Sequence, residues 1–223
     1  MKLNNKRTIL VGLAFLSICA FWQMYDSVVP LILTKTFHMN ETFSGAIMAA
    51  DNILALFLLP FFGSLSDRSH SKIGKRMPFI LFGTGCAVIL MNILPLLDNS
   101  YAAQPSGLKT ASFVIVLGLL LVTMGTYRSP AVALMPDVTP KPLRSRANAI
   151  INLMGAVGGI LYLGVAAVLY PNSKTAGLDH VNYQPLFIVV SAIMFIAIAV
   201  LFLTVKEPKL TAENQALEKQ HPE

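Results

Sequence analysis

The chain has 223 residues, 55% of them hydrophobic and 13% charged, and its mean hydropathy is +0.64. Soluble domains carry about 25% charged residues, so the composition excludes an ordinary soluble protein and indicates a chain solvated by lipid. The net charge of +6 does not point to nucleic acid, because the bases lie in short loops between apolar stretches. Cys19 and Cys86 both lie inside apolar runs, which argues against a disulfide framework.

Six apolar stretches are predicted to cross a bilayer as helices. A hydrocarbon core about 30 Å thick requires about 20 helical residues at a rise of about 1.5 Å each. In chain order, the predicted spans cover residues 8–33, 41–62, 77–97, 110–134, 145–169 and 184–205. We therefore expect a six-helix membrane bundle over residues 1–205 and a polar tail over residues 206–223. The first apolar run is too long for the core of a cleaved signal peptide, so we expect it to be retained.

Lysine and arginine are distributed unevenly between the two sides of these spans. Of the 17 such residues, all but Lys35, Lys109 and Lys174 fall at the N-terminus, around the ends of spans two and four, or after span six. Positive loops remain in the cytoplasm during membrane insertion. Both termini and the loops 63–76 and 135–144 are therefore predicted to be cytoplasmic, in a multi-pass protein of the cell membrane.

The loop between spans two and three reads GSLSDRSHSKIGKR and combines glycines with an acid and several bases. The residues that form this pattern are Gly63, Asp67, Arg68, Gly74, Lys75 and Arg76. Their order resembles the signature loop of the major facilitator superfamily, in the longer form found in its sucrose-type and glycoside–pentoside–hexuronide sugar symporter branches. The stretches ALMPDVTPKPLRSRANAI, after span four, and VKEP, after span six, resemble loops of the same transporters.

This resemblance implies an all-α integral membrane protein whose six helices form one half, a 3+3 inverted repeat, of a twelve-span fold. It implies a transporter and not an enzyme: a proton-coupled symporter of a glycoside or disaccharide that works by alternating access. The implied partners are a small sugar, a proton, the lipid bilayer and a C-terminal six-helix half, with the tail 206–223 as the start of the linker. The signature loop would form a cytoplasmic gate of ion pairs. The sequence shows no pattern for a cofactor, metal ion or nucleic acid.

Two departures from these branches leave the coupling mechanism open. Ala55 and Leu59 occupy the positions where melibiose-type cation symporters carry paired acids. No acid lies within residues 110–127, where plant-type sucrose symporters carry one. Two other functions therefore remain as alternatives: an exporter of drugs or metabolites with the same fold, and a non-transporting half that needs a partner.

Two acids inside the predicted spans are the main candidates for proton coupling or substrate binding. An ionised side chain in the hydrocarbon costs about 2.5–3.5 kcal/mol on insertion scales, so it is retained mainly for function. Asp51 lies near the middle of span two and Asp26 in the outer half of span one. The structural alternatives are a hydrogen-bonding acid between helices for Asp51 and a water-binding acid in the outer vestibule for Asp26.

Polar and aromatic residues in these and neighbouring spans are predicted to line a sugar site, because amide oxygens accept hydroxyl protons and an aromatic ring can stack on a pyranose. They are Trp22, Gln23, Asn52 and Asn152. Trp22 could instead belong to the aromatic belt at the membrane interface. Asn152 shares a helix face with Gly155 and Gly159, for which helix packing is the favoured role.

Arg128 is predicted at the cytoplasmic end of span four. There it would pair with Asp67 or bind a substrate, or it would extend its guanidinium to the membrane surface as a purely structural arginine. The histidines lie in loops and tails, where a solvated role is expected.

Overall fold

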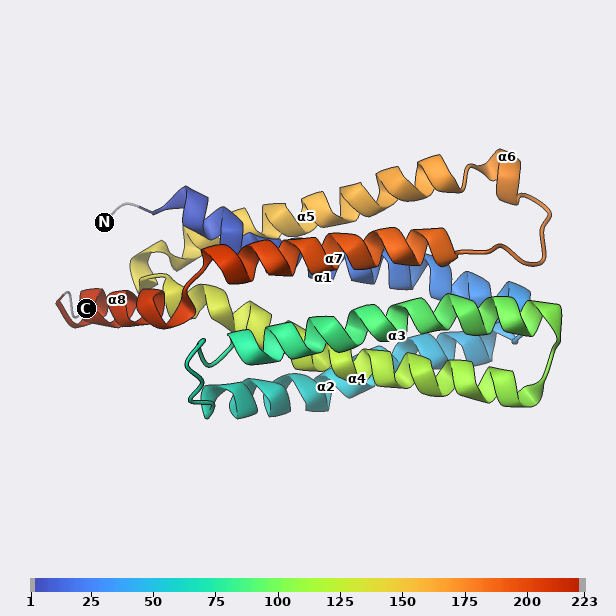
Figure 1. Cartoon of the computed structure of the whole chain (residues 1–223), viewed down its shortest axis with the longest axis horizontal. Coiled ribbons are helices and arrows are strands. Elements are labelled where there is room, and N and C mark those ends of the chain that lie inside the picture. The colour runs from blue at the N-terminus through green and yellow to red at the C-terminus, as the bar shows by residue number, and fades with distance from the viewer. Residues whose placement is uncertain (1–2, 221–223) are drawn as a thin grey trace.

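Long helices that run side by side dominate the computed structural model, which describes residues 3–220 and contains no strand within them (Figure 1). The long helices are α1 (Asn5–Leu31), α2 (Glu41–Asp67), α3 (Met77–Ala103), α4 (Gly107–Val138), α5 (Arg144–Leu169) and α7 (Gln184–Thr204). A π-helical turn, η1 (Ile32–Thr36), extends α1. The short elements are a 3-10 turn (Lys141–Leu143), α6 (Asn172–Thr175) and α8 (Glu207–Gln220). Within the described residues, six helices are long and apolar enough to cross a membrane.

Local sequence signals set several helix ends. The side chains of Asn4 and Asn40 accept hydrogen bonds from the backbone N–H groups of Arg7 (3.1 Å) and Thr42 (2.9 Å), and so cap α1 and α2. Prolines in the first turns of α3 and α7 fit there because the first helical N–H groups have no partner inside the helix.

The helices pack in an order that differs from their order in the chain. α1 packs against α5 and α7, while α3 packs against α4 and α7. α2 packs mainly on α4 and leaves apolar side chains such as Leu56 and Phe57 about 70% and 66% exposed. The start of α1 and the whole of α8 lie at one end of the bundle, and α6 lies at the other (Figure 1). The start of α1 and α8 share an end because the chain crosses the bundle six times, an even number.

Small residues allow α1 and α5 to approach closely. A Cβ atom at Gly158 would overlap the backbone carbonyl of Leu16, and one at Gly155 would lie 2.8 Å from Cys19 Sγ. A Cβ at Gly159 would meet only the Gln23 side chain, at 3.7 Å. The packing role expected for Gly155 therefore fits the structure. The second glycine in close contact with α1 is Gly158, and not Gly159 as expected.

Three helices continue past the C-terminal ends of their predicted spans, because helical hydrogen bonding does not require an apolar sequence. α2 continues to Asp67, α3 to Ala103 and α4 to Val138. Arg128 therefore lies within α4 and does not close it, which corrects the expectation from sequence. The tail also contains a helix, α8, which is joined to α4 by a hydrogen bond of 3.1 Å from the Asn214 amide to the Asp137 carbonyl.

Candidate functional site

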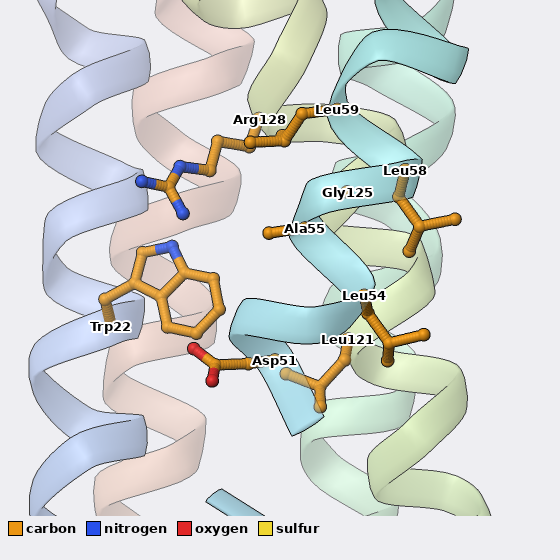
Figure 2. Close-up of a pocket in the computed structure, with 9 residues that line it drawn as sticks. All are labelled: Trp22, Asp51, Leu54, Ala55, Leu58, Leu59, Leu121, Gly125 and Arg128. Carbon is orange, nitrogen blue, oxygen red and sulfur yellow. The ribbon is translucent and has the colours of Figure 1, made fainter. Parts of the chain in front are cut away.

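A cleft between α1, α2 and α4 brings together an aromatic ring and two opposite charges. Trp22 enters it from α1, Asp51 from α2 and Arg128 from α4 (Figure 2). The remaining wall is apolar and consists of Leu54, Ala55, Leu58, Leu59, Leu121 and Gly125. The space inside the cleft is small, about 20 Å³, which is room for about one water molecule. Pockets for small ligands hold about 300–1,000 Å³, so a sugar would not fit inside this space and would contact the three residues at its open side.

The indole of Trp22 lies between the two charges. The guanidinium carbon of Arg128 is 5.5 Å from the centre of the indole ring, within the range of a cation–π interaction. The carboxylate of Asp51 approaches the other side of the ring (Figure 2). This interaction holds the Arg128 guanidinium inside the cleft, although an arginine side chain is long enough to extend towards a membrane surface.

Two hydrogen-bond donors on α1 are buried without an acceptor. Neither Trp22 Nε1 nor the Tyr25 hydroxyl has a hydrogen-bond partner within the described residues. The indole of Trp22 packs edge to face against two aromatic neighbours. The distance between ring centres is 5.2 Å to Phe21 and 5.3 Å to Tyr25, and this packing fixes the orientation of the indole. Buried donors normally have a partner. Trp22 lines the cleft, so its N–H is the one of the two that a ligand or water there could satisfy.

Asp51 is half-buried and keeps a polar neighbour. The side-chain amide of Asn52 donates to Asp51 Oδ1 at 2.9 Å, and Asn52 itself is exposed. One carboxylate oxygen is thus held by the adjacent amide. The other oxygen of Asp51 has no hydrogen-bond partner within the described residues and can meet a proton or a hydroxyl group.

The other predicted binding residues lie outside this cleft. Asp26 is exposed, within electrostatic range of Asp51. Gln23 points towards Gly159 of α5. Asn152 is exposed, and its amide donates to the Asn148 carbonyl of its own helix at 2.9 Å. The structure thus groups Trp22, Asp51 and Arg128, with Asn52 adjacent.

A second charged cluster joins the ends of α2, α3 and α4 and includes much of the signature loop. The Arg76 guanidinium is buried and donates to Asp67 of α2, to Asp137 Oδ2 of α4 at 2.9 Å, and to the Gly63 carbonyl at 3.3 Å. Lys75 Nζ lies 3.2 Å from Asp137 Oδ2. We call Arg76, Lys75, Asp67 and Asp137 the end network.

The structure gives two of the predicted bases different surroundings from those expected. Asp67 pairs with Arg76 and Lys75, so Arg128 is not its partner. Arg68 is exposed and makes no ion pair within residues 3–220. Asp137 was not singled out from the sequence, and its position among prolines after span four was the only signal available.

Glu207 is the buried acid that closes this end of the bundle. It is 2% exposed, and its carboxylate accepts the backbone N–H groups of Lys75 (2.9 Å), Arg76 (2.9 Å) and Met77 (2.8 Å). A carboxylate in this position satisfies the first N–H groups of α3 and complements the helix dipole. Gly74 has a φ of +119°, and a Cβ there would overlap the Glu207 carboxylate. The glycine of the signature loop therefore makes room for an acid that follows span six.

The most deeply buried acid of the spans is Asp98, which sequence reasoning missed because the predicted third span ended at Leu97. Asp98 is 0% exposed, and neither of its carboxylate oxygens has a hydrogen-bond partner in the described residues. His180 Nδ1 lies 3.8 Å away. The imidazole also contacts Thr36 Oγ1 at 3.2 Å and Asn99 Oδ1 at 3.0 Å. His180 is thus a connecting residue at the end of the bundle opposite α8, and not a solvated one as expected.

Comparison with known proteins places this architecture. The family model of the Major Facilitator Superfamily matches residues 11–222. The chain is 34% identical over 145 residues to sucrose transport protein SUC3 of Arabidopsis thaliana, covering 60% of the chain and 24% of that protein. It is 33% identical over 141 residues to sucrose transport protein SUT3 of Oryza sativa subsp. indica, covering 57% and 28%. It is 26% identical over 179 residues to the alpha-ketoglutarate permease of Escherichia coli (strain K12), covering 79% and 38%.

In each case the match spans well under half of the relative's length. The family match, by contrast, extends over nearly the whole chain, and the helices have the length, composition and all-α arrangement that the signature loop predicts. The predicted fold class is thereby confirmed, and the chain belongs to the Major Facilitator Superfamily.

Proposed function

We propose that this chain forms the first six helices of a secondary active transporter that carries a small sugar, a glycoside or disaccharide, together with a proton. In this proposal, residues 1–205 form the membrane bundle and residues 206–223 begin a cytoplasmic linker to a second half. The protein spans the cell membrane with both of its termini in the cytoplasm. Membership of the superfamily and the similarity to sucrose transport proteins support the substrate class.

The observation that carries the proposal is the position of Trp22 between Asp51 and Arg128 in the cleft. A fixed indole offers a flat apolar face to a sugar ring, and its unpartnered N–H can donate to a sugar oxygen. The Asp51 carboxylate accepts hydroxyl protons, and the Arg128 guanidinium donates to ring or hydroxyl oxygens. One cleft therefore supplies the stacking surface, the acceptor and the donors that a sugar requires.

The same three residues suggest how a proton could be coupled to the sugar. Asp51 is half-buried and keeps an unpartnered oxygen, so it can take up a proton from water in the cleft. Asp51 and Arg128 form no ion pair within the described residues, so protonation would act on the substrate directly. A protonated Asp51 can donate a hydrogen bond to a sugar oxygen as well as accept one. Proton and sugar would then bind cooperatively, because the sugar contacts the protonated carboxyl group and the coupling between the two ligands is reciprocal.

The end network provides the second element of alternating access. Arg76 ties the ends of α2, α3 and α4 together through Asp67 and Asp137, so these helices would move as one body at their cytoplasmic ends. We assign the signature loop, including Gly63, to this half of a gate. Its opposing surface would belong to the second half of the transporter.

The test is sugar-dependent proton uptake into membrane vesicles that carry the complete transporter. We expect Asp51→Asn to abolish sugar-driven proton uptake while sugar exchange across the membrane continues, because exchange needs no net proton movement. Asp179→Asn, an exposed loop acid, is the matched control and should transport normally. Normal coupling in both Asp51→Asn and Asp26→Asn would refute the assignment of the proton to these acids.

A second candidate substrate is an organic anion, and two observations favour it. The cleft contains a guanidinium, and the match to the alpha-ketoglutarate permease covers 79% of the chain. An Arg128→Gln variant separates the two: it would abolish binding of a dicarboxylate and only weaken that of a neutral sugar. If the transporter took up neither the dicarboxylate nor the sugar but drove efflux of hydrophobic cations with protons, it would be an exporter.

A further inference from the structure

A groove with three lysines opens at the end of the bundle where α3 begins and α7 ends. Lys72 belongs to the loop before α3, and Lys206 and Lys209 belong to the segment that leads from α7 into α8. Its floor is apolar and includes Ile73, Met77 and Phe202. The groove has a volume of about 270 Å³ and is partly open to solvent. It is separate from the cleft that contains Trp22 and from the end network.

The charge of this groove is not neutralised by the protein. Within residues 3–220, Lys72, Lys206 and Lys209 make no ion pair. Other bases at the same end do have acidic partners; they are Arg7, Lys75, Arg76 and Arg144. The Lys206 ammonium lies 5.8 Å from the centre of the Phe202 ring, a cation–π contact that holds it over the groove. Three converging positive charges therefore lack a counter-ion.

The groove also lies at the level where a membrane changes from hydrocarbon to headgroups. α7 is an apolar span that ends at Thr204, and Lys206 lies two residues after it. Phe202 lies in its last turn and Met77 in the first turn of α3. In a membrane, the exposed part of Phe202 would face the acyl chains, and the ammonium groups would stand at the height of lipid phosphates. Basic pockets between helices in this position suit anionic headgroups.

We propose that this groove binds an anionic phospholipid, with the phosphate among the three lysines and the upper part of an acyl chain against Phe202. A neutral lipid lacks the net charge, and a free phosphate lacks the chain that covers the floor. The site would have a structural consequence, because Glu207 lies between Lys206 and Lys209 in the chain and caps α3. A bound lipid would hold together the same segments that Glu207 joins. The proposal needs only the membrane location and not the transport function.

The test compares lipids on the purified chain in detergent. Phosphatidylglycerol should raise the midpoint of thermal unfolding, and phosphatidylcholine with the same acyl chains should raise it less. The variant Lys72→Gln/Lys206→Gln/Lys209→Gln should lose this difference, since each lysine near an anionic surface contributes roughly a fivefold gain in affinity. The matched control, Lys6→Gln/Lys141→Gln/Lys219→Gln, removes the same charge from exposed lysines at the same end and should keep it. High salt should weaken the effect in the wild type.

A measurement without variants protects the test against misfolding. Acetylation of the wild-type chain should be slowed at Lys72, Lys206 and Lys209 by phosphatidylglycerol, and unchanged at Lys6 and the other control lysines. Equal protection of both sets, or an unchanged lipid response in the groove variant, would overturn the site. An equal thermal shift with inorganic phosphate would show an adventitious anion site and would overturn the assignment to lipid.

Discussion

Gly74 is needed for two separate reasons, its backbone conformation and the space beside it. Its φ of +119° is unfavourable for any residue with a Cβ, and that atom would overlap the Glu207 carboxylate. We predict that Gly74→Ala lowers the free energy of unfolding by about 2–4 kcal/mol, from backbone strain and the loss of charge-assisted hydrogen bonds to α3. Chemical unfolding in detergent would measure it.

Gly118→Ala is the matched control for this substitution. Gly118 lies within α4, and a Cβ there would meet nothing within 4 Å. Alanine is the better helix former by about 0.5–1 kcal/mol, so this variant should be as stable as the wild type or more stable. Equal stability of Gly74→Ala and the wild type would mean that Glu207 does not occupy the site beside Gly74.

Asp98 and His180 are expected to depend on each other energetically. Asp98 is fully buried, and the imidazole at 3.8 Å is its one ion-pair partner within the described residues. His180 is 28% exposed and is charged only when protonated, but Asp98 is fully buried, and a buried polar group left without a partner costs about 1–3 kcal/mol. We predict that His180→Gln is strongly destabilising alone but much less so in an Asp98→Asn background. The double-mutant cycle should give a coupling of about 1 kcal/mol or more.

An exposed neighbour provides the control for that cycle. Asp179 adjoins His180 in the chain and is exposed. Its substitution by asparagine should change stability by less than about 0.5 kcal/mol and should add independently to His180→Gln. If the free-energy changes of Asp98→Asn and His180→Gln also simply added in the double variant, the contact between the two residues would contribute nothing to stability.

At the scale of the helix, the contact between α1 and α5 is set by backbone proximity. Gly158 leaves no room for a Cβ beside the Leu16 carbonyl, so Gly158→Ala must push the two helices apart. Overpacking of this kind costs about 1–3 kcal/mol. We predict a loss of that size, measured by unfolding in detergent. Gly164→Ala on the same helix, where a Cβ meets nothing within 4 Å, should not be destabilising.

The helices also show where prediction from sequence succeeds and where it stops. Apolar length identifies every span, because the hydrocarbon demands it. It does not identify where a helix ends, since α3 and α4 continue into polar sequence. For this reason the prediction left Asp98 outside its helix and placed Arg128 at the end of a helix that in fact continues past it.

For the whole molecule, the distribution of charge predicts an orientation that labelling can test. Ser71, in the loop between α2 and α3, and Ser173, in α6, are both exposed. That loop and α6 lie at opposite ends of the bundle (Figure 1). In a background without Cys19 and Cys86, Ser173→Cys should react with a membrane-impermeant thiol reagent in intact cells. Ser71→Cys should react only after permeabilisation, because the loops rich in lysine and arginine remain inside. The reverse pattern would invert the proposed topology.

The sequence by itself determined the membrane class, the six spans and the resemblance to a transporter superfamily. These follow from composition and from motifs within short stretches of chain, which need no knowledge of distant contacts. It also indicated Asp51, Trp22 and Arg128 as candidates, since charges and aromatic rings in apolar segments are conspicuous one at a time.

The tertiary structure alone decided which of these residues meet. Trp22 lies between Asp51 and Arg128 because α1, α2 and α4 converge, whereas Asn152 shares no contact with that cleft. Only the fold brings Glu207 to Gly74 and His180 to Asp98. These contacts join residues far apart in the chain, and their energies depend on burial and distance, which helix packing creates and no local pattern records.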